Sequence, residues 1–281
     1  MKKYILHIGT EKTATTSLQA FFGHNQDYLQ QAGIWYPSAE TLDYCHRGAH
    51  FPLAASLVPE CPDFVTRGKH FEPRALFQRL FTDFGSRDEE TVLLSAEHFS
   101  SRCSRPERVS LLGEIMADKD VQVIVYVRPQ HELLLSAYST FLKSGGKKTI
   151  EHVAREQWLR PGAIYFNYFR MVKRWWDIFG RKRVTVRVFQ PERLHGGDVY
   201  KDFLAALGID WSDKLLIPAR QNPPINKELA DFLFLANQHF PAFNEGDRAG
   251  WELGMKFRTE VVDLFPEGRP LHYLLGNELK Q

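Results

Sequence analysis

The sequence predicts an α/β fold in which a parallel sheet is flanked by helices. Short apolar runs that end at glycine, proline or a polar residue are typical of buried strands, and segments with helical spacing of apolar residues alternate with them. Strands and helices that alternate in this way form a parallel sheet covered on both faces. Hydrophobic residues make up 43% and charged residues 25% of the 281 residues, as in ordinary globular proteins. Because the chain shows no internal repeat or linker, we expect a single domain over residues 1–281.

Each element follows from its local pattern. Five apolar runs are expected to form strands: Tyr4–Ile8, Ile34–Tyr36, Thr91–Ser95, Val121–Val127 and Val184–Phe189. Five segments are expected to form helices: Thr15–Ala32, Arg74–Phe84, His131–Lys143, Ile164–Phe179 and Val199–Leu207. Residues 37–74 contain five prolines and are expected to form a loop with one short helix near Pro52–Val58. A helical C-terminal region is expected to follow.

The bulk properties exclude several classes of protein. A net charge of +2 is too small for a general nucleic-acid binder, although a local anion pocket is compatible with it. Cys45, Cys61 and Cys103 show no metal-binding or paired spacing, which indicates a reducing compartment. The first apolar run stops at His7, short of the roughly 7–15 residues of a signal peptide. No run approaches the roughly 20 residues of a membrane span. We therefore expect a cytoplasmic protein without integral membrane association.

The first candidate site is the segment Gly9–Ser17, which links the first strand to the first helix. Backbone N–H groups, the positive end of a helix and small hydroxyl side chains meet there, and such a turn binds phosphate. Lys12 adds a mobile positive charge. The segment is P-loop-like but is not a Walker A motif, because the second glycine is missing. The alternative is an ordinary turn with a solvated lysine. The candidate phosphate-binding residues are Thr10, Glu11, Lys12, Thr13, Ala14, Thr15, Thr16 and Ser17.

The second candidate site combines Arg128, at the end of the strand Val121–Val127, with Ser136 in the following helix. Open parallel sheets bind ligands at the carboxyl ends of their strands, and the guanidinium group suits phosphate oxygens. Pro129 keeps Arg128 extended and allows the helix to begin directly afterwards. Alone, the pair is a weak signal, since a strand-end arginine often forms a surface ion pair and a helical serine is often solvated.

Together, the two segments resemble the family of sulfotransferases that use 3′-phosphoadenosine 5′-phosphosulfate (PAPS). The phosphosulfate loop of that family reads approximately KxGTTxL or KxATTSL, and Lys12–Leu18 matches it closely. The family's 3′-phosphate motif places a serine eight residues after a strand-end arginine, as in Arg128 and Ser136. Phe203–Gly208 is similar to the family's FLxxLG helix. The resemblance follows the order of elements over residues 4–210, and its specific part is about twenty residues.

The sequence departs from the family pattern at two places. Ala14 stands where the family's loop usually has glycine, a variation associated with bacterial members. The C-terminal basic and glycine-containing stretch that binds the 3′-phosphate in cytosolic members is not evident, and Arg220–Asn222 is a weak substitute. The resemblance therefore implies a bacterial enzyme that acts on a saccharide or lipid-linked acceptor.

The resemblance also implies a mechanism. PAPS would donate its sulfuryl group in line to a hydroxyl or amine of a carbohydrate or other small acceptor and leave as 3′,5′-ADP, without a metal. Lys12 would stabilise charge on the bridging oxygen, and Arg128 and Ser136 would bind the 3′-phosphate. Its partner is then a small molecule or glycan and not a nucleic-acid polymer, and the sequence leaves the oligomeric state open.

The acceptor must lose a proton, so the mechanism needs a base. The family places the base after the strand that precedes the arginine strand, and Glu97 is the first candidate there, followed by His98. A surface carboxylate and a structural histidine are the alternatives. His46 and His50 are candidates for the acceptor pocket, although loop histidines are more often solvated, and His7 is expected in the core.

Three other functions compete with this interpretation. A P-loop nucleotide kinase or phosphotransferase would have a similar fold, but the missing GK[ST] pattern argues against it. A non-catalytic sensor of 3′,5′-ADP would share the phosphate motifs and lack turnover. A carbohydrate-binding module would not explain Lys12, Arg128 and Ser136 together.

Overall fold

The computed structural model describes residues 2–60, 70–159, 163, 165–219, 225–241 and 247–274. The chain forms two compact units. The first contains Met1–Arg128 and Asn167–Gln221, and the second contains Pro129–Phe166 and Asn222–Gln281. The candidates Arg220 and Asn222 lie outside the described residues.

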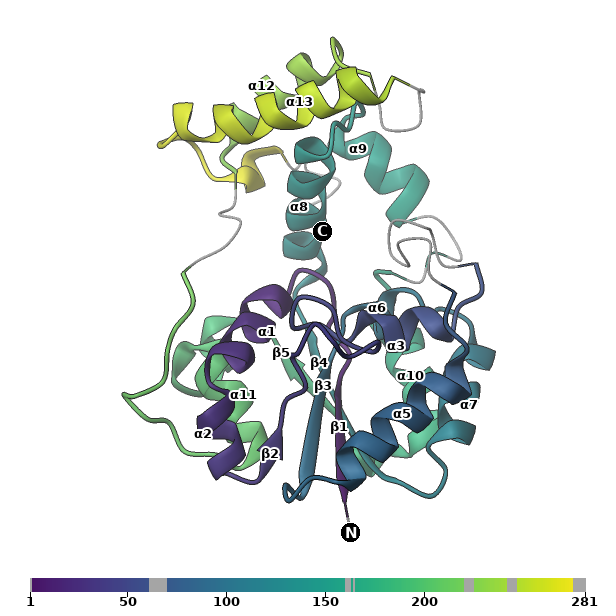
Figure 1. Ribbon diagram of the computed structural model, residues 1–281. Coiled ribbons are helices and arrows are strands. Elements are labelled where there is room, and N and C mark those ends of the chain that lie inside the picture. Colours follow the sequence, from purple (N-terminus) through teal and green to yellow (C-terminus); the bar gives the residue numbers. More distant parts are fainter. Residues whose placement is uncertain are drawn as a thin grey trace. The chain divides into compact units, whose positions relative to one another are not determined.

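The first unit is built on a five-stranded sheet with the strand order β2-β3-β1-β4-β5 (Figure 1). The strands are β1 (Lys3–His7), β2 (Ile34–Trp35), β3 (Thr91–Ser95), β4 (Asp120–Val127) and β5 (Val184–Val188). Every pair is parallel, so the predicted fold class is confirmed. The chain leaves β1 in one direction toward β2 and later crosses to β4 on the other side. Such a reversal opens a crevice at the carboxyl ends of the central strands.

Side chains of the central strand alternate between two cores, as expected for a strand that is buried on both faces. Tyr4, Leu6 and Ile8 belong to one hydrophobic cluster, and Ile5 belongs to the other. Helices cover both faces of the sheet (Figure 1). One face is covered by α3 (Phe51–Ser56), α5 (Pro73–Gly85), α6 (His98–Ser101), α7 (Pro106–Ile115) and α10 (Tyr168–Phe179). The other face is covered by α1 (Thr15–His24), α2 (Gln26–Gln31) and α11 (Val199–Leu207). The short helices η2 (Arg181–Arg183), η3 (Pro191–Arg193) and η4 (His195–Gly197) flank β5.

The structure departs from the predicted elements at two helices. The single helix expected over Thr15–Ala32 is interrupted at Asn25. The buried Asn25 side chain donates to the carbonyl of Leu216 at 2.9 Å and accepts from the Leu216 N–H at 2.8 Å. Contact with a segment that is distant in the sequence therefore fixes the position of the break. The fourth expected helix begins only at Tyr168, because the Asn167 side chain caps it by accepting from Arg170 N–H at 3.0 Å.

The second unit is helical. Its elements are α8 (Gln130–Lys143), α9 (Ile150–Val153), η1 (Ala154–Trp158), α12 (Lys227–Asn237), α13 (Arg248–Glu260), η5 (Val261–Leu264) and η6 (Leu271–Leu274). The Asn237 side chain donates to the carbonyls of Leu142 and Gly146, each at 2.9 Å, and so joins α12 to the end of α8. The predicted helical C-terminal region is confirmed (Figure 1). Across the described ranges of both units, we find no helix with the length and apolarity that a bilayer crossing requires.

Candidate functional site

The loop after β1 approaches the end of β3 more closely than a side chain would allow. Gly9 has a φ of 94°, and a Cβ atom there would lie 2.9 Å from both Cα and Cβ of Glu97. On the other side, Gly9 O accepts from Tyr126 N–H at 2.7 Å, and Thr10 N–H donates to Tyr126 O at 2.8 Å. Glycine at position 9 therefore allows the loop to pass between the ends of β3 and β4.

Three threonine hydroxyls of the predicted phosphate-binding segment hold the loop in shape. Thr13 and Thr15 donate to the carbonyl of Thr10 at 2.7 and 3.0 Å, and Thr10 donates to the carbonyl of Tyr126 at 3.0 Å. All three side chains are buried. Their hydroxyl protons are therefore used inside the protein, and so is the Thr10 N–H, which donates to Tyr126 O. Any contact that these threonines make with an anion would come from the backbone N–H groups of Thr13 and Thr15. Thr16 is exposed and Ser17 half-buried.

The loop has left-handed backbone at Lys12 (φ 65°) and Ala14 (φ 60°). Such conformations are uncommon for residues other than glycine and concentrate at functional sites. They are also typical of concave loops whose N–H groups face an anion. Ala14 is the N-cap of α1 and makes no side-chain capping bond to the N–H groups of the first turn, which have no acceptor within the helix itself. Glycine in the related loops would adopt this conformation without strain.

Lys12 and Arg128 lie next to each other, at the carboxyl ends of β1 and β4. Arg128 follows β4 and donates from Nη1 to the carbonyl of Lys12 at 2.9 Å. Its guanidinium group lies 5.6 Å from the ring centroid of Phe189, and its own carbonyl accepts from the Tyr168 hydroxyl at 2.7 Å. Burial lowers the pKa of Lys12, while Glu11 and Glu97 act in the opposite direction. Two cations therefore lie beside the loop, at the ends of β1 and β4.

Ser136, the second residue of the predicted 3′-phosphate motif, lies in the second turn of α8. Ser136 belongs to the second unit. Arg128 belongs to the first unit, at the end of the range Met1–Arg128. The Ser136 side chain is half-buried. Its role as a phosphate ligand stays a prediction.

Glu97 is held at the end of β3 by contacts from both its backbone and its side chain. Its carbonyl accepts from Ser100 N–H at 3.1 Å and from Ser100 Oγ at 2.9 Å, in the first turn of α6. Its Oε2 accepts from Gln19 Nε2 at 3.2 Å. Because Glu97 also counteracts the lowering of the pKa of Lys12, the carboxylate and the ammonium group share one electrostatic environment.

His98, the second candidate base, begins α6 directly after Glu97. Burial lowers its pKa, and the charge of Arg102 acts in the same direction, while Glu97 and Glu11 oppose the shift. Its ring centroid lies 5.5 Å from that of Phe51. Nδ1 is buried and makes no hydrogen bond to the described residues. His98 is therefore packed against apolar side chains and favours the neutral form.

The two histidines predicted for an acceptor pocket lie in different surroundings. His46 is half-buried, with Nδ1 3.4 Å from Glu40 Oε2. His50 is 0% exposed, accepts at Nδ1 from Ser95 N–H at 2.9 Å and donates from Nε2 to Pro37 O at 2.7 Å. Burial lowers its pKa to about 4. Both ring nitrogens are used inside the core, so this placement does not support an acceptor-binding role for His50.

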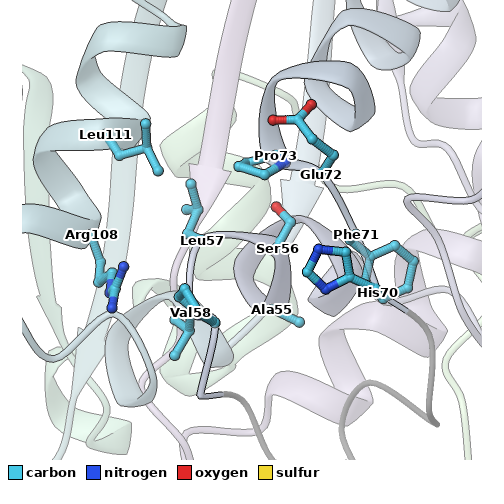
Figure 2. A pocket seen from close by; sticks show the side chains of 11 residues that line it. Ala55, Ser56, Leu57, Val58, His70, Phe71, Glu72, Pro73, Arg108 and Leu111 are labelled. Carbon is cyan, nitrogen blue, oxygen red and sulfur yellow. The ribbon is translucent and has the colours of Figure 1, made fainter.

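A pocket of the first unit lies among other residues (Figure 2). It is lined by Ala55–Pro59, His70–Pro73, Arg108 and Leu111, and none of these is a predicted site residue. Two of its charged groups are already engaged: Glu72 caps α5, and Arg108 pairs with Glu60 at 3.0 Å. No group of three or more metal-binding side chains occurs in the part of the chain that the structure describes. The candidate site is therefore the edge formed by the ends of β1, β3 and β4.

Sequence reasoning missed Gln19. It lies on α1 and contacts both Ser95 and Glu97. The only signal that could have suggested it is a polar residue on the buried face of an otherwise apolar helix.

Comparisons with known proteins support the fold. No family model matches the chain. An uncharacterized protein of Archaeoglobus fulgidus is 27% identical over 105 residues, which are 37% of this chain and only 27% of that protein's length. A crystal structure of a sulfotransferase from Alicyclobacillus acidocaldarius superposes with a TM-score of 0.51 and 20% identity, covering 90% of this chain and 99% of that one. The sulfotransferase domain of the curacin biosynthetic pathway has a TM-score of 0.40 and 10% identity over 79% of this chain and 78% of that one. The chain thus shares the fold of the Alicyclobacillus sulfotransferase.

Proposed function

We propose that this protein transfers the sulfuryl group of PAPS to a hydroxyl or amine of a carbohydrate or other small acceptor. The observation that carries the proposal is the meeting of Lys12, Arg128 and Glu97 at the ends of three neighbouring parallel strands. The sulfotransferase resemblance of the Lys12–Leu18 segment and the shared fold support it.

The cationic part of the site suits a substrate with two anionic ends. The loop N–H groups and Lys12 would hold the phosphosulfate, and Arg128 would hold the 3′-phosphate, a role for which the sequence motif also predicts Ser136. In-line sulfuryl transfer resembles phosphoryl transfer, in which positioning and electrostatic stabilisation provide most of the catalysis. Lys12 would contribute most as negative charge develops on the departing oxygen. The lowered pKa of Lys12 is consistent with a partly desolvated ammonium group, whose interaction with an anion is stronger than in water.

The anionic part of the site supplies the base. Glu97 would accept the proton of the acceptor hydroxyl or amine as that group attacks the sulfur. Its backbone is fixed by the turn into α6, and its Oε2 is held by Gln19. His98 is the second candidate, because a neutral imidazole can also accept a proton.

The two alternatives differ from this function in ligand choice and turnover. A nucleotide kinase would need a loop for the β- and γ-phosphates of ATP, and the Walker A glycine before the lysine is replaced by Glu11. A 3′,5′-ADP sensor would bind the same nucleotide and transfer nothing.

Nucleotide preference tests the proposal first. Only 3′,5′-ADP carries phosphates for both the loop and Arg128, so it should raise the Tm more than 5′-AMP or Mg-ATP at equal concentrations. Thermal shift measurements on the full chain give the comparison. Equal shifts, or a larger shift with Mg-ATP, would contradict the proposal and favour the kinase.

Turnover separates the enzyme from the sensor. The full chain is incubated with ³⁵S-labelled PAPS and a panel of glycans, phenols, amines and lipids. We expect label on at least one acceptor of the panel and release of 3′,5′-ADP in equal amount. Tight binding of 3′,5′-ADP with no transfer to any acceptor would favour the sensor.

A further inference from the structure

A buried chain of hydrogen bonds leads from the middle of the sheet to the carboxylate of Glu97. His7 Nδ1 lies 2.8 Å from Ser95 Oγ. Gln19 Nε2 lies 3.3 Å from the same Ser95 Oγ and 3.2 Å from Glu97 Oε2. The Ser95 carbonyl lies 3.4 Å from Gln19 Nε2. The four side chains therefore form one connected chain.

Three elements bring these residues together. His7 and Ser95 are register partners on β1 and β3, and Gln19 lies on α1, just after the phosphate loop. His7 and Ser95 are 0% exposed and Gln19 is 7% exposed. Buried polar groups are costly unless they are hydrogen-bonded, so this chain is strongly constrained. The same helix that begins at the loop thus also contacts the candidate base.

The direction of each hydrogen bond follows from the chemistry at the two ends. An ionised carboxylate only accepts, so Gln19 must turn its amide nitrogen toward Glu97. The second amide proton is then directed at Ser95 Oγ, which leaves the Ser95 hydroxyl proton for His7 Nδ1. Burial lowers the pKa of His7 to about 3, so the ring is neutral, and Nδ1 accepts the Ser95 proton in the tautomer that carries its proton on Nε2. Nε2 is buried and makes no hydrogen bond to the described residues. At the other end of the chain the direction is fixed, because reversing the Gln19 amide would place an oxygen against the carboxylate.

We propose that Gln19 is a positioning residue that holds the Glu97 carboxylate in one orientation, and that Ser95 and His7 fix the orientation of Gln19. This inference rests on the proposed function, because it takes Glu97 as the base. A base acts efficiently only when it is held in reach of the proton that it accepts. The bond from Gln19 to Oε2 and the close approach of Gly9 to Glu97 Cα and Cβ together fix the side chain.

The test compares kcat and the KM for PAPS of Gln19→Met with those of the wild-type protein in the ³⁵S transfer assay. Methionine is similar in size to glutamine and lacks the donor. We expect kcat to fall by about tenfold, as for the loss of one hydrogen bond to a charged group, while the KM for PAPS stays at the wild-type value. Gln19→Glu places a second carboxylate beside Glu97 and should lower kcat further. Gln30→Leu, at an exposed position on α2, is the matched control and should leave both values unchanged.

The Tm shift with 3′,5′-ADP is measured on every variant, and it should stay at the wild-type value. Ser95→Ala provides a second variant in case Gln19→Met does not fold, and it should lower kcat by less, because the Ser95 carbonyl remains within reach of the Gln19 amide. An unchanged kcat in a folded variant that binds 3′,5′-ADP would overturn the role of Gln19 and leave the proposed function intact. A wild-type protein that neither binds 3′,5′-ADP nor transfers label would instead overturn the proposed function itself.

Discussion

The segments that follow β1 and β3 reach the same edge of the sheet but are stabilised in different ways. In the β1 segment, the Thr13 and Thr15 hydroxyls donate to the carbonyl of Thr10, three and five residues away, and the backbone is also bonded to Tyr126 and Arg128 at the end of β4. In the β3 segment, the Glu97 carboxylate accepts from Gln19 on α1, which is 78 residues away in the sequence. The ends of β1 and β4 contribute the cations Lys12 and Arg128, and the end of β3 contributes the carboxylate of Glu97.

This difference suggests a division of labour between the two strand ends. The β1 end would bind the donor and stabilise its leaving group, whereas the β3 end would activate the acceptor. If the division holds, substitutions at the β3 end should affect turnover and spare nucleotide binding, and substitutions at Arg128 should do the reverse. The first three predictions below test this division, and the fourth concerns the buried histidines near the end of β3; they are given in order of expected effect.

The largest effect is expected at the β3 end. Glu97→Gln keeps the shape of the side chain and removes its basicity, so kcat should fall by about 10²–10⁴-fold. The Tm shift with 3′,5′-ADP should be unchanged. His98→Asn is the matched neighbour and should retain most of its turnover in the ³⁵S transfer assay. Normal turnover of Glu97→Gln together with an inactive His98→Asn would assign the base to His98.

The second effect concerns Lys12. Lys12→Ala should lower kcat by about 10²–10³-fold, because the contact strengthens as the leaving group gains charge, and should weaken nucleotide binding by less. Single-turnover measurements with ³⁵S-PAPS and a titration of 3′,5′-ADP separate the two effects. Lys173→Ala, an exposed lysine of α10 that pairs with Asp177, serves as control. An unchanged kcat in Lys12→Ala would remove the lysine from the catalytic machinery.

Arg128→Ala should weaken 3′,5′-ADP binding by about 10–150-fold, which corresponds to the loss of about 1.5–3 kcal/mol from a charged hydrogen bond. We expect kcat at saturating PAPS to change much less than in Lys12→Ala. Isothermal titration and steady-state kinetics provide the two values, with the exposed Arg105→Ala as control. A fall in kcat as large as that of Lys12→Ala would show that the two cations act as one unit and that the division between them is wrong.

The smallest effect concerns stability. Burial lowers the pKa of His50 to about 4 and that of His7 to about 3, both from 6.5. Between pH 6.5 and these lowered pKa values, the unfolded chain binds more protons than the folded chain. The free energy of unfolding is therefore highest above about pH 6.5 and decreases as the pH falls toward 4. Each histidine should contribute at most about 1.4 kcal/mol per pH unit within this window. Urea unfolding at pH 7.5, 6.0 and 5.0 measures the slope, and His50→Gln should reduce it. A free energy of unfolding that is constant from pH 7.5 to 5.0 would contradict the prediction.

Much of the fold and of the candidate site follows from local patterns in the sequence. The strands carry apolar residues on both faces, the helices repeat theirs at three and four positions, and the Lys12–Leu18 segment predicts a phosphate loop. Arg128 was also predictable, although it bonds to a residue 116 positions away, because the carboxyl ends of parallel strands meet at one edge.

Only the tertiary structure decided which side chains surround the candidate base. In the sequence, Gln19 cannot be distinguished from any other polar residue of a helix. The packing of α1 places its amide between Ser95 and Glu97. In the sequence, His50 has the features of a loop histidine. In the structure, hydrogen bonds with Ser95 and Pro37 use both of its ring nitrogens. Loops held by hydrogen bonds over three to five residues are encoded in neighbouring residues, and such patterns can be recognised in a single sequence. The contacts around Glu97 join segments that are 78 and 88 residues apart, and they exist only after the sheet has set the register of β1 against β3.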